Sequence, residues 1–293
     1  MKRLLVTGGS GFLGSYLLDA AQGWDVYAAY YSRPLTSSKA TALPLDLRDE
    51  GAIRVALRDI RPSAIIHTAC SNRSPEHIGA IRSAAHHLAC AAHDHGLRLV
   101  HLSSDLVFDG AHPPYAAAAP LTPLTEYARA KAEAEAIVAE LCPSAVIVRP
   151  SLIWRLDPPD HQTQWLLEGI RRGEKITLFT DEYRCPVHIH DLSLALLGLA
   201  DRPDIAGTMN LVGPQPLNRW DFALKVLAAL GCEPGSNVVR GTVEESGLVR
   251  ARDLTLLATR ARQLLKTRLR SVDEVLFPVK KEARYCASLA DRA

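Results

Sequence analysis

The stretch "RLLVTGGSGFLGSYLLDAAQG", residues 3–23, decides the fold of this chain. Residues 3–7 form a short apolar run typical of a buried strand, and the glycines that follow open an amphipathic helix. Gly8, Gly11 and Gly14 recur every third residue, which permits a tight turn, close approach of the backbone to a pyrophosphate, and close helix–strand packing. The helix N-terminus then offers free N–H groups to phosphates. We therefore predict a dinucleotide site in which six residues of this turn contact the cofactor: Gly8, Ser10, Gly11, Phe12, Leu13 and Gly14.

Beyond this turn, apolar strand-like runs alternate with helical patterns. Strands are predicted near residues 25–31, 43–47, 63–70, 97–104 and 144–151, and helices over 49–60, 74–95 and 126–141. This alternation predicts an α/β fold, a Rossmann-type doubly wound parallel sheet with helices on both faces. After Pro150 the pattern changes, and loops rich in Pro and Trp separate the helices. We predict a dinucleotide-binding domain over 1–150, joined by 187–212, and a smaller C-terminal substrate-binding region over 151–186 and 213–293.

The end of the second strand indicates which dinucleotide binds. An acid there would pair with the ribose hydroxyls of NAD, but the sequence is "AAYYSRP", with Ser32 and Arg33. Arg33 offers a cation for the 2′-phosphate of NADP, so NADP is the predicted cofactor and NAD the alternative. Asp46 is predicted either to reach the adenine amino group or to cap the next helix. Leu47 and Ala69 complete the predicted cofactor contacts.

The helix "EYARAKAEAEAIVAEL", residues 126–141, places Tyr127 and Lys131 four residues apart. At this spacing the two side chains share one helix face. A free tyrosine has a pKa of about 10, and a neighbouring ammonium lowers it by favouring the phenolate. The pair is therefore suited to acid–base chemistry, although such pairs also arise by chance in amphipathic helices.

The glycine turn, a serine after the fifth strand and the Tyr127–Lys131 pair together resemble the extended short-chain dehydrogenase/reductases. "HLSSDLVFDGAHPPY", residues 101–115, is similar to the "SSDYVFDG…PPY" segment of the dTDP-4-dehydrorhamnose reductases and of the related methionine adenosyltransferase beta subunit. The resemblance implies that Tyr127 protonates a substrate carbonyl and also contacts the cofactor, that Lys131 binds the nicotinamide ribose, and that Ser104 hydrogen-bonds the carbonyl oxygen. It also implies substrate contacts from five residues of the cleft: Asn72, Arg73, Trp154, Arg184 and Arg250.

Three departures from this family keep other functions open. Ile81 stands where relatives carry a helix asparagine, Leu106 replaces a tyrosine, and alanines fill 116–119 in place of acidic residues. The predicted function is an NADP-dependent reductase of a nucleotide-activated (4-keto-deoxy) sugar. The alternatives are a non-catalytic NADP-binding regulatory subunit and a sugar-nucleotide epimerase or dehydratase.

The composition indicates the class of protein, its partners and its location. With 293 residues, 47% hydrophobic content, 23% charged residues and a net charge of +2, the chain is typical of a soluble globular protein, with neither nucleic acid nor membrane as partner. No signal peptide or membrane span is visible, and the six cysteines form no CxxC pair, which favours reduced thiols and a cytoplasmic location. The histidines, including "HIH" at 188–190 on a predicted strand, do not indicate a metal site. A homodimer is an open expectation.

Overall fold

The computed structural model describes residues 1–69 and 75–277. Within these ranges seven parallel strands form one sheet in the order β11-β6-β5-β4-β1-β2-β3. Their bounds are β1 Lys2–Thr7, β2 Trp24–Tyr30, β3 Thr41–Pro44, β4 Ala64–His67, β5 Arg98–Leu102, β6 Val146–Pro150 and β11 Gly207–Leu211. The strand order reverses beside β1, which is the position where doubly wound sheets bind ligands.

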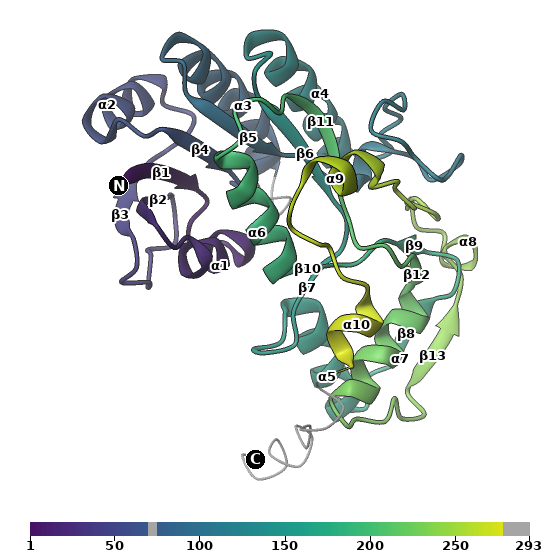
Figure 1. Cartoon of the computed structure of the whole chain (residues 1–293). Helices are drawn as coiled ribbons and strands as arrows, with labels where there is room; N and C mark the ends of the chain where they lie inside the picture. The colour runs from purple at the N-terminus through teal and green to yellow at the C-terminus, as the bar shows by residue number, and fades with distance from the viewer. Residues whose placement is uncertain (70–74, 278–293) are drawn as a thin grey trace.

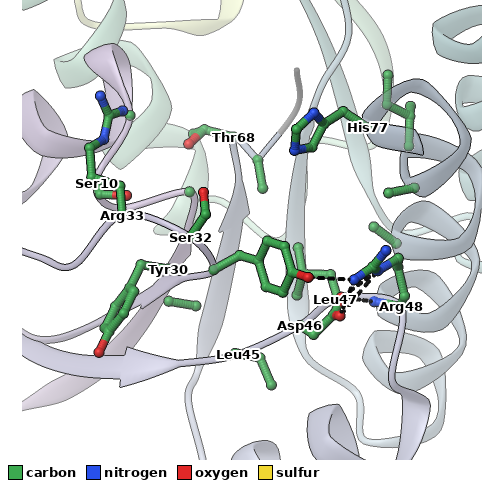
Figure 2. A pocket seen from close by; sticks show the side chains of 18 of the residues that line it. Ser10, Tyr30, Ser32, Arg33, Leu45, Asp46, Leu47, Arg48, Thr68 and His77 are labelled. Carbon is green, nitrogen blue, oxygen red and sulfur yellow. Dashed lines mark hydrogen bonds and ion pairs between the residues drawn. The ribbon is translucent and has the colours of Figure 1, made fainter. Parts of the chain in front are cut away.

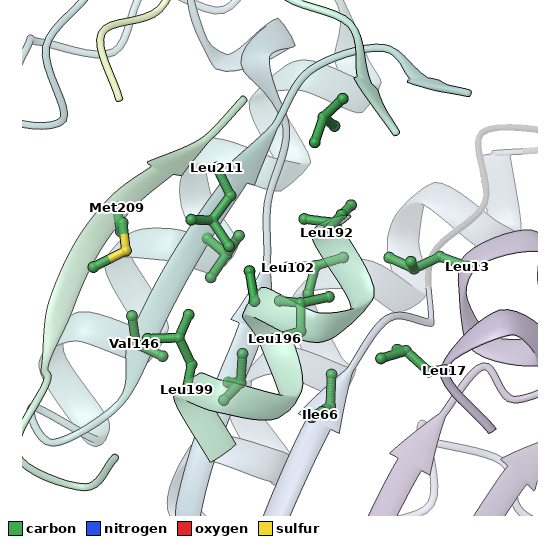
Figure 3. Close-up of a cluster of buried hydrophobic side chains, with 14 of the residues drawn as sticks. Leu13, Leu17, Ile66, Leu102, Val146, Leu192, Leu196, Leu199, Met209 and Leu211 are labelled. Carbon is green, nitrogen blue, oxygen red and sulfur yellow. The ribbon is translucent and has the colours of Figure 1, made fainter. Parts of the chain in front are cut away.

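Helices cover both faces of this sheet (Figure 1). One face carries α1 (Phe12–Ala20) and α6 (Ile189–Ala200), which contact each other and bury a leucine-rich core shown in Figure 3. The other face carries α2 (Glu50–Ile60), α3 (Pro75–Asp94) and α4 (Glu126–Leu141). Strands β1, β4, β5 and β6 are buried on both faces, as expected for a parallel sheet.

Several C-terminal helices and short strands gather beyond the carboxyl ends of the strands around a separate core that contains Trp154. Short strand pairs are β7 with β10, β9 with β12, and β8 with β13. The bounds in this part of the chain are η1 Asp105–Val107, β7 Ile153–Trp154, α5 His161–Arg172, β8 Ile176–Phe179, β9 Tyr183–Arg184, β10 Val187–His188, β12 Leu217–Asn218, α7 Arg219–Ala229, β13 Val238–Gly241, α8 Val243–Ser246, α9 Thr259–Leu264 and α10 Val272–Leu276.

Side-chain caps fix where the long helices begin. Thr125 accepts a hydrogen bond from the Ala128 N–H and starts α4, and Asp49 accepts one from Ala52 and starts α2. Asp49, and not Asp46, is therefore the cap of the helix after β3, which corrects one of the two roles predicted for Asp46. In α1, by contrast, Gly11 occupies the cap position and no side chain caps the helix.

The predicted fold class is confirmed, since the sheet is parallel and the strands lie where the sequence placed them. The residue boundaries of the two predicted regions stay a prediction, although β11 pairs with β6. The segment 188–190 is not a strand throughout, because His188 ends β10 and His190 lies in α6. Cys90, Cys142 and Cys185 carry free thiols, whereas Cys232 is disulfide-bonded, contrary to the expectation of reduced cysteines. No helix among the described residues is long and apolar enough to cross a membrane.

Candidate cofactor and active site

The glycine turn between β1 and α1 has the backbone geometry that a phosphate cradle needs. Gly8 has a φ of +72°, and its carbonyl accepts the Gly11 N–H at 2.9 Å. A Cβ on Gly14 would lie 2.1 Å from the Gly8 oxygen, so any side chain there would push α1 away from the turn. The uncapped first turn of α1 leaves its N–H groups for an anion. These features fit the pyrophosphate of a dinucleotide.

A cleft of about 420 Å³ opens over this turn and runs along the carboxyl ends of β1, β2 and β4 (Figure 2). Tyr30, Tyr31, Thr68 and His77 line it beside residues of the turn. Nine of the predicted cofactor contacts lie in its wall: Gly8, Ser10, Gly11, Phe12, Ser32, Arg33, Asp46, Leu47 and Ala69. Leu13 is buried in the core below, and Gly14 acts through the close packing of α1.

Two arginines stand at the end of the cleft predicted to hold the adenosine, and they are engaged differently. Arg33 is exposed and has no hydrogen bond or ion pair with any described residue. Arg48 is fully engaged: its guanidinium contacts both carboxylate oxygens of Asp46, pairs with Glu76, and donates to the Tyr31 hydroxyl at 2.7 Å. In Figure 2 Arg33 points away from the Asp46–Arg48 pair. Of these two arginines, Arg33 is therefore the one whose guanidinium is free to receive a ligand.

Asp46 does not have the free carboxylate that its predicted contact with adenine requires. The Arg48 hydrogen bonds lower the pKa of this carboxyl, so it stays ionised and paired. Arg48 and Tyr31 were missed by the sequence analysis. Arg48 could have been found from its position, since it directly follows the predicted strand "LPLDL". Residues that follow a parallel strand lie at the ligand-binding edge of the sheet.

Helix α4 carries Tyr127 and Lys131 one turn apart on its sheet-facing side. Lys131 is 1% exposed, and its Nζ donates to the carbonyl of Leu102, the last residue of β5. Tyr127 is half-buried and packs against the core on this face of the sheet. The buried ammonium is thus held at the carboxyl end of β5, one helical turn from the phenol.

Ser104 lies directly beyond the same strand and is already hydrogen-bonded. Its hydroxyl donates to Asp105 Oδ1 at 3.2 Å and accepts the Leu106 N–H at 3.2 Å, which starts η1. The neighbouring Ser103 hydroxyl is buried and has no partner among the described residues. The sheet therefore brings Lys131 and Ser104 to one strand end.

Beneath this edge lie two buried histidines, His67 on β4 and His101 on β5, whose Cα atoms are register partners. Their ring centroids are 5.1 Å apart, and His67 Nδ1 lies 2.7 Å from the Thr7 hydroxyl. Burial, with Lys131 nearby, lowers the pKa of His67 to about 3 and that of His101 well below its ordinary value. Both rings are therefore neutral at physiological pH.

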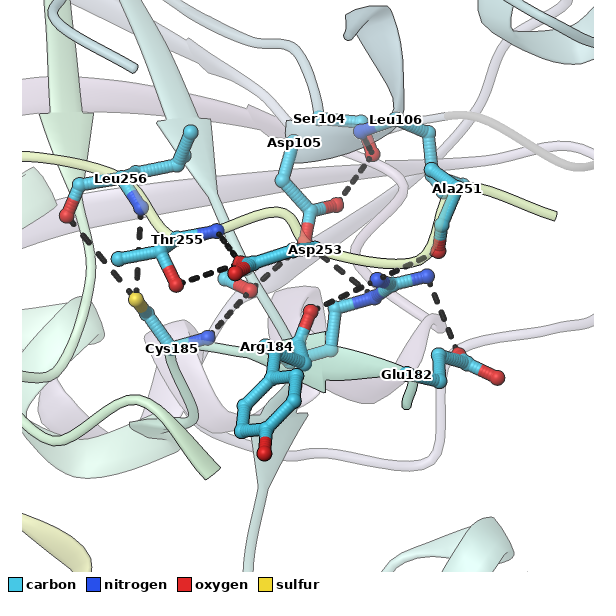
Figure 4. Close-up of polar contacts among 12 residues, drawn as sticks. Ser104, Asp105, Leu106, Glu182, Arg184, Cys185, Ala251, Asp253, Thr255 and Leu256 are labelled. Atoms are coloured by element: carbon cyan, nitrogen blue, oxygen red, sulfur yellow. Dashed lines mark hydrogen bonds and ion pairs between the residues drawn. The ribbon is translucent and has the colours of Figure 1, made fainter. Parts of the chain in front are cut away.

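Arg184 occupies the centre of a buried polar network, not an open phosphate site (Figure 4). Its guanidinium pairs with Glu182 at 3.1 Å and Asp105 at 3.7 Å, and donates to the carbonyls of Tyr183 and Ala251. Only 9% of its side chain is exposed. Protein groups thus already surround the guanidinium of Arg184, and its contact with the substrate stays a prediction.

The other predicted substrate residues have different environments. Trp154 is 1% exposed and packs edge-on against His188 and Phe222, so it is a core residue, and its contact with the substrate stays a prediction. Arg250 keeps 46% of its side chain exposed while it pairs with Glu182 at 3.2 Å, and it remains a candidate. Asn72 and Arg73 lie outside the described residues.

Arg219, which the sequence analysis did not single out, belongs to the same cluster. Its Nε lies 3.7 Å from Glu182, and its Nη2 donates to Gln162 at 2.6 Å. Glu182 thus contacts three arginines, since Arg184 and Arg250 share it. No local motif marked Arg219, because its partners lie 37 and 57 residues away along the chain.

A parallel sheet with a glycine cradle at β1 and a Tyr–Lys pair on the helix after β5 defines a nucleotide-binding protein of the extended short-chain dehydrogenase/reductase class. Residues 1–276 match the RmlD substrate binding domain, and the chain belongs to that family. The resemblance noted in the sequence is thereby confirmed.

Individual relatives support the same family. The chain is 29% identical over 243 residues to dTDP-4-keto-6-deoxy-D-glucose reductase of Streptomyces niveus, covering 80% of each chain. It is 26% identical over 261 residues to methionine adenosyltransferase 2 subunit beta of Danio rerio, covering 84% of this chain and 79% of the relative. The fold is similar to that of dTDP-4-dehydrorhamnose reductase from Bacillus anthracis in complex with NADP, with a TM-score of 0.80, 22% identity, and 97% and 100% of the two chains covered.

Proposed function

We propose that this protein is an NADP-dependent reductase that transfers hydride to a carbonyl of a nucleotide-activated keto sugar. The observation that supports this most is the meeting of two separate motifs at one edge of the sheet. The glycine cradle lies at the end of β1, and Lys131, one turn from Tyr127, reaches the end of β5. The sugar-nucleotide substrate is supported by the relative from Streptomyces niveus, whose name describes such a reductase.

The side chains divide the proposed chemistry among them. NADPH, when bound, supplies the hydride. Tyr127 donates its phenolic proton to the carbonyl oxygen, and the Lys131 ammonium one turn away favours the phenolate that this leaves. Ser104 stabilises the developing charge when its hydroxyl turns from Asp105 to the substrate oxygen. Because Lys131 is buried, its charge acts on the tyrosine with little screening by water.

The cofactor assignment rests on Arg33. No carboxylate of residues 1–69 or 75–277 pairs with this exposed guanidinium, which lines the cleft beside Ser32. Asp46, the nearby acid, is held by Arg48. An unpaired guanidinium binds a 2′-phosphate more strongly than the hydroxyl of NAD, because the bond to phosphate joins opposite charges, so NADP is the proposed cofactor and NAD the alternative.

A second function, a non-catalytic NADP-binding subunit, is favoured by one structural observation. The Ser104 hydroxyl already has hydrogen-bond partners in Asp105 and Leu106. The similarity to a methionine adenosyltransferase beta subunit also supports a binding subunit. Such a protein would keep the glycine cradle and Arg33 while Tyr127 served no reaction. A cytoplasmic location and a homodimer stay predictions.

Tyr127→Phe separates these two functions. The variant loses the transferable proton and keeps the ring, so for a reductase we expect kcat on a keto-sugar nucleotide to fall at least a hundredfold, with NADPH affinity nearly unchanged. NADPH absorbance measures turnover, and fluorescence titration measures binding. Wild-type protein that binds NADPH but reduces no member of a keto-sugar nucleotide panel would support the binding subunit.

Arg33→Ala tests the cofactor. Loss of one charge-assisted contact is expected to weaken NADPH about tenfold to a hundredfold and to leave NADH unchanged. Titration of both reduced cofactors into wild type and variant measures the effect. Equal affinity of the wild type for NADPH and NADH would contradict the assignment.

A further inference from the structure

Arg155, at the start of the loop between β7 and α5, lies against the first turns of α1. Its guanidinium carbon is 5.2 Å from the centroid of the Phe12 ring and 5.9 Å from that of Tyr16. Phe12 is the first residue of α1 and lines the cofactor cleft. Helical side chains lean toward the N-terminus of their helix, so these two rings hold the guanidinium beside the N-terminal end of α1. A cation from the C-terminal part of the chain thus lies against the N-terminal half of α1.

The loop fixes the position of this cation. Arg155 Nε donates to the Pro158 carbonyl at 2.8 Å, and the Arg155 N–H donates to Asp160 Oδ2 at 3.1 Å. Asp160 returns a hydrogen bond to the Arg155 carbonyl at 3.0 Å and caps α5. The ring of His161, the next residue, packs edge-on against the Phe12 ring, with the two ring centroids 6.5 Å apart. The backbone and Nε are therefore anchored, and the side chain cannot swing freely into solvent.

The two terminal nitrogens of Arg155 have no partner among residues 1–69 and 75–277, and no carboxylate lies within ion-pair distance of the guanidinium. Arg149 and Arg270 differ in this respect, since they pair with Glu135 and Asp191. The Asp160 carboxylate is turned to backbone N–H groups and to Thr163. The charge of Arg155 is thus uncompensated in a half-buried place.

The neighbouring end of α1 adds positive potential to that of Arg155. The uncapped N-terminus of α1 carries the positive end of the helix dipole, which disfavours a neighbouring cation. The titratable groups on this side include Tyr16, His161, His188, His190 and the Asp191–Arg270 pair. Burial is the main cause that lowers the pKa of His188 to about 4, and the charge of Arg155 is a minor one. An anion between Arg155 and the helix N-terminus satisfies both positive features at once.

We propose that Arg155 donates its two terminal N–H groups to the pyrophosphate of the bound dinucleotide. This inference rests on the proposed dinucleotide binding and goes beyond it, because the ligand comes from outside the glycine turn. The pyrophosphate is then held from one side by the α1 backbone and from the other by the β7–α5 loop. Cofactor binding thereby ties the C-terminal part of the chain to the sheet.

The test compares affinities for four ligands in wild type and Arg155→Ala: NADPH, NADH, ADP-ribose and adenosine 2′-phosphate. The first three contain a pyrophosphate and the fourth does not. We expect the variant to bind these three about tenfold to a hundredfold more weakly, by one common factor, and adenosine 2′-phosphate unchanged. Arg155→Lys keeps the charge without the planar fork and should recover part of the loss.

Two matched variants complete the design. Arg33→Ala should give the opposite pattern, weakening NADPH and adenosine 2′-phosphate while sparing NADH and ADP-ribose. Arg171→Ala removes an exposed arginine from α5 and should change none of the four affinities. Unchanged NADPH and ADP-ribose affinities in Arg155→Ala overturn the inference, as does an equal loss for adenosine 2′-phosphate, which indicates a general distortion. Wild-type protein that binds none of the ligands overturns the proposed function itself.

Discussion

At the residue scale, the least expected feature is the pair of neutral histidines inside the sheet. Thr7, His67 and His101 are register partners on three adjacent strands, and all three are at most 2% exposed. Neither ring nitrogen of His101 has a partner among the described residues. Burying an unpaired polar group opposes folding, and charging such a ring opposes it further. The Lys131 ammonium adds to that cost, because it lowers the pKa of both rings.

These histidines predict an acid limit to stability. Their folded-state pKa values lie below the unfolded value of about 6.5, so only the unfolded chain gains protons as the pH falls from 6.5 toward 3. Each ring then removes about 1.4 kcal/mol of stability per pH unit. We expect His101→Leu to reduce this slope by about that amount, measured by urea unfolding between pH 6.5 and 5. His95→Gln, at an exposed position, is the control. An unchanged slope in His101→Leu contradicts this explanation.

At the scale of elements, the features that could be predicted from the sequence are those that depend on residues close together along the chain. The glycine spacing before α1 and the Tyr127–Lys131 spacing on α4 depend on consecutive residues, and both elements form as expected. Roles set by distant partners could not be predicted in this way. The environment of Trp154 comes from a core assembled by α5, α7 and α10, and that of Asp46 comes from Arg48, which also contacts α3. Local spacing carries no information on such contacts.

The contact between α1 and the turn predicts unequal effects of two glycine substitutions. Gly14→Ala places a Cβ 2.1 Å from the Gly8 carbonyl, so α1 must move. We expect the free energy of unfolding to fall by roughly 1–3 kcal/mol. We also expect NADPH to bind more weakly. Gly198→Ala on α6 meets nothing within 4 Å and should be neutral or stabilise by about 0.4–1 kcal/mol, with unchanged cofactor binding. Thermal unfolding and NADPH titration measure both variants. If Gly14→Ala binds NADPH like wild type, close packing at this glycine is not required.

At the scale of the whole molecule, one buried polar network joins the sheet to the C-terminal part of the chain. Asp105, after β5, accepts the Ser151 hydroxyl at 2.6 Å and pairs with Arg184 on β9. Arg184 also pairs with Glu182, which contacts Arg219 on α7 and Arg250. The network lies just beyond Ser104, so the proposed catalytic edge and the C-terminal elements are held by the same charges.

This arrangement predicts that Arg184 contributes to stability and not to substrate affinity. Arg184→Ala leaves Asp105 and Glu182 buried without their shared cation, and breaking such a pair costs about 3–5 kcal/mol. Arg250→Ala removes a half-exposed partner of Glu182 and should cost at most about 1 kcal/mol. Urea unfolding of the two variants at pH 7 measures the difference without any substrate. A wild-type midpoint for Arg184→Ala, with a raised KM for a sugar nucleotide, would return Arg184 to the role of a phosphate ligand, because a guanidinium that the fold does not need is free to bind one.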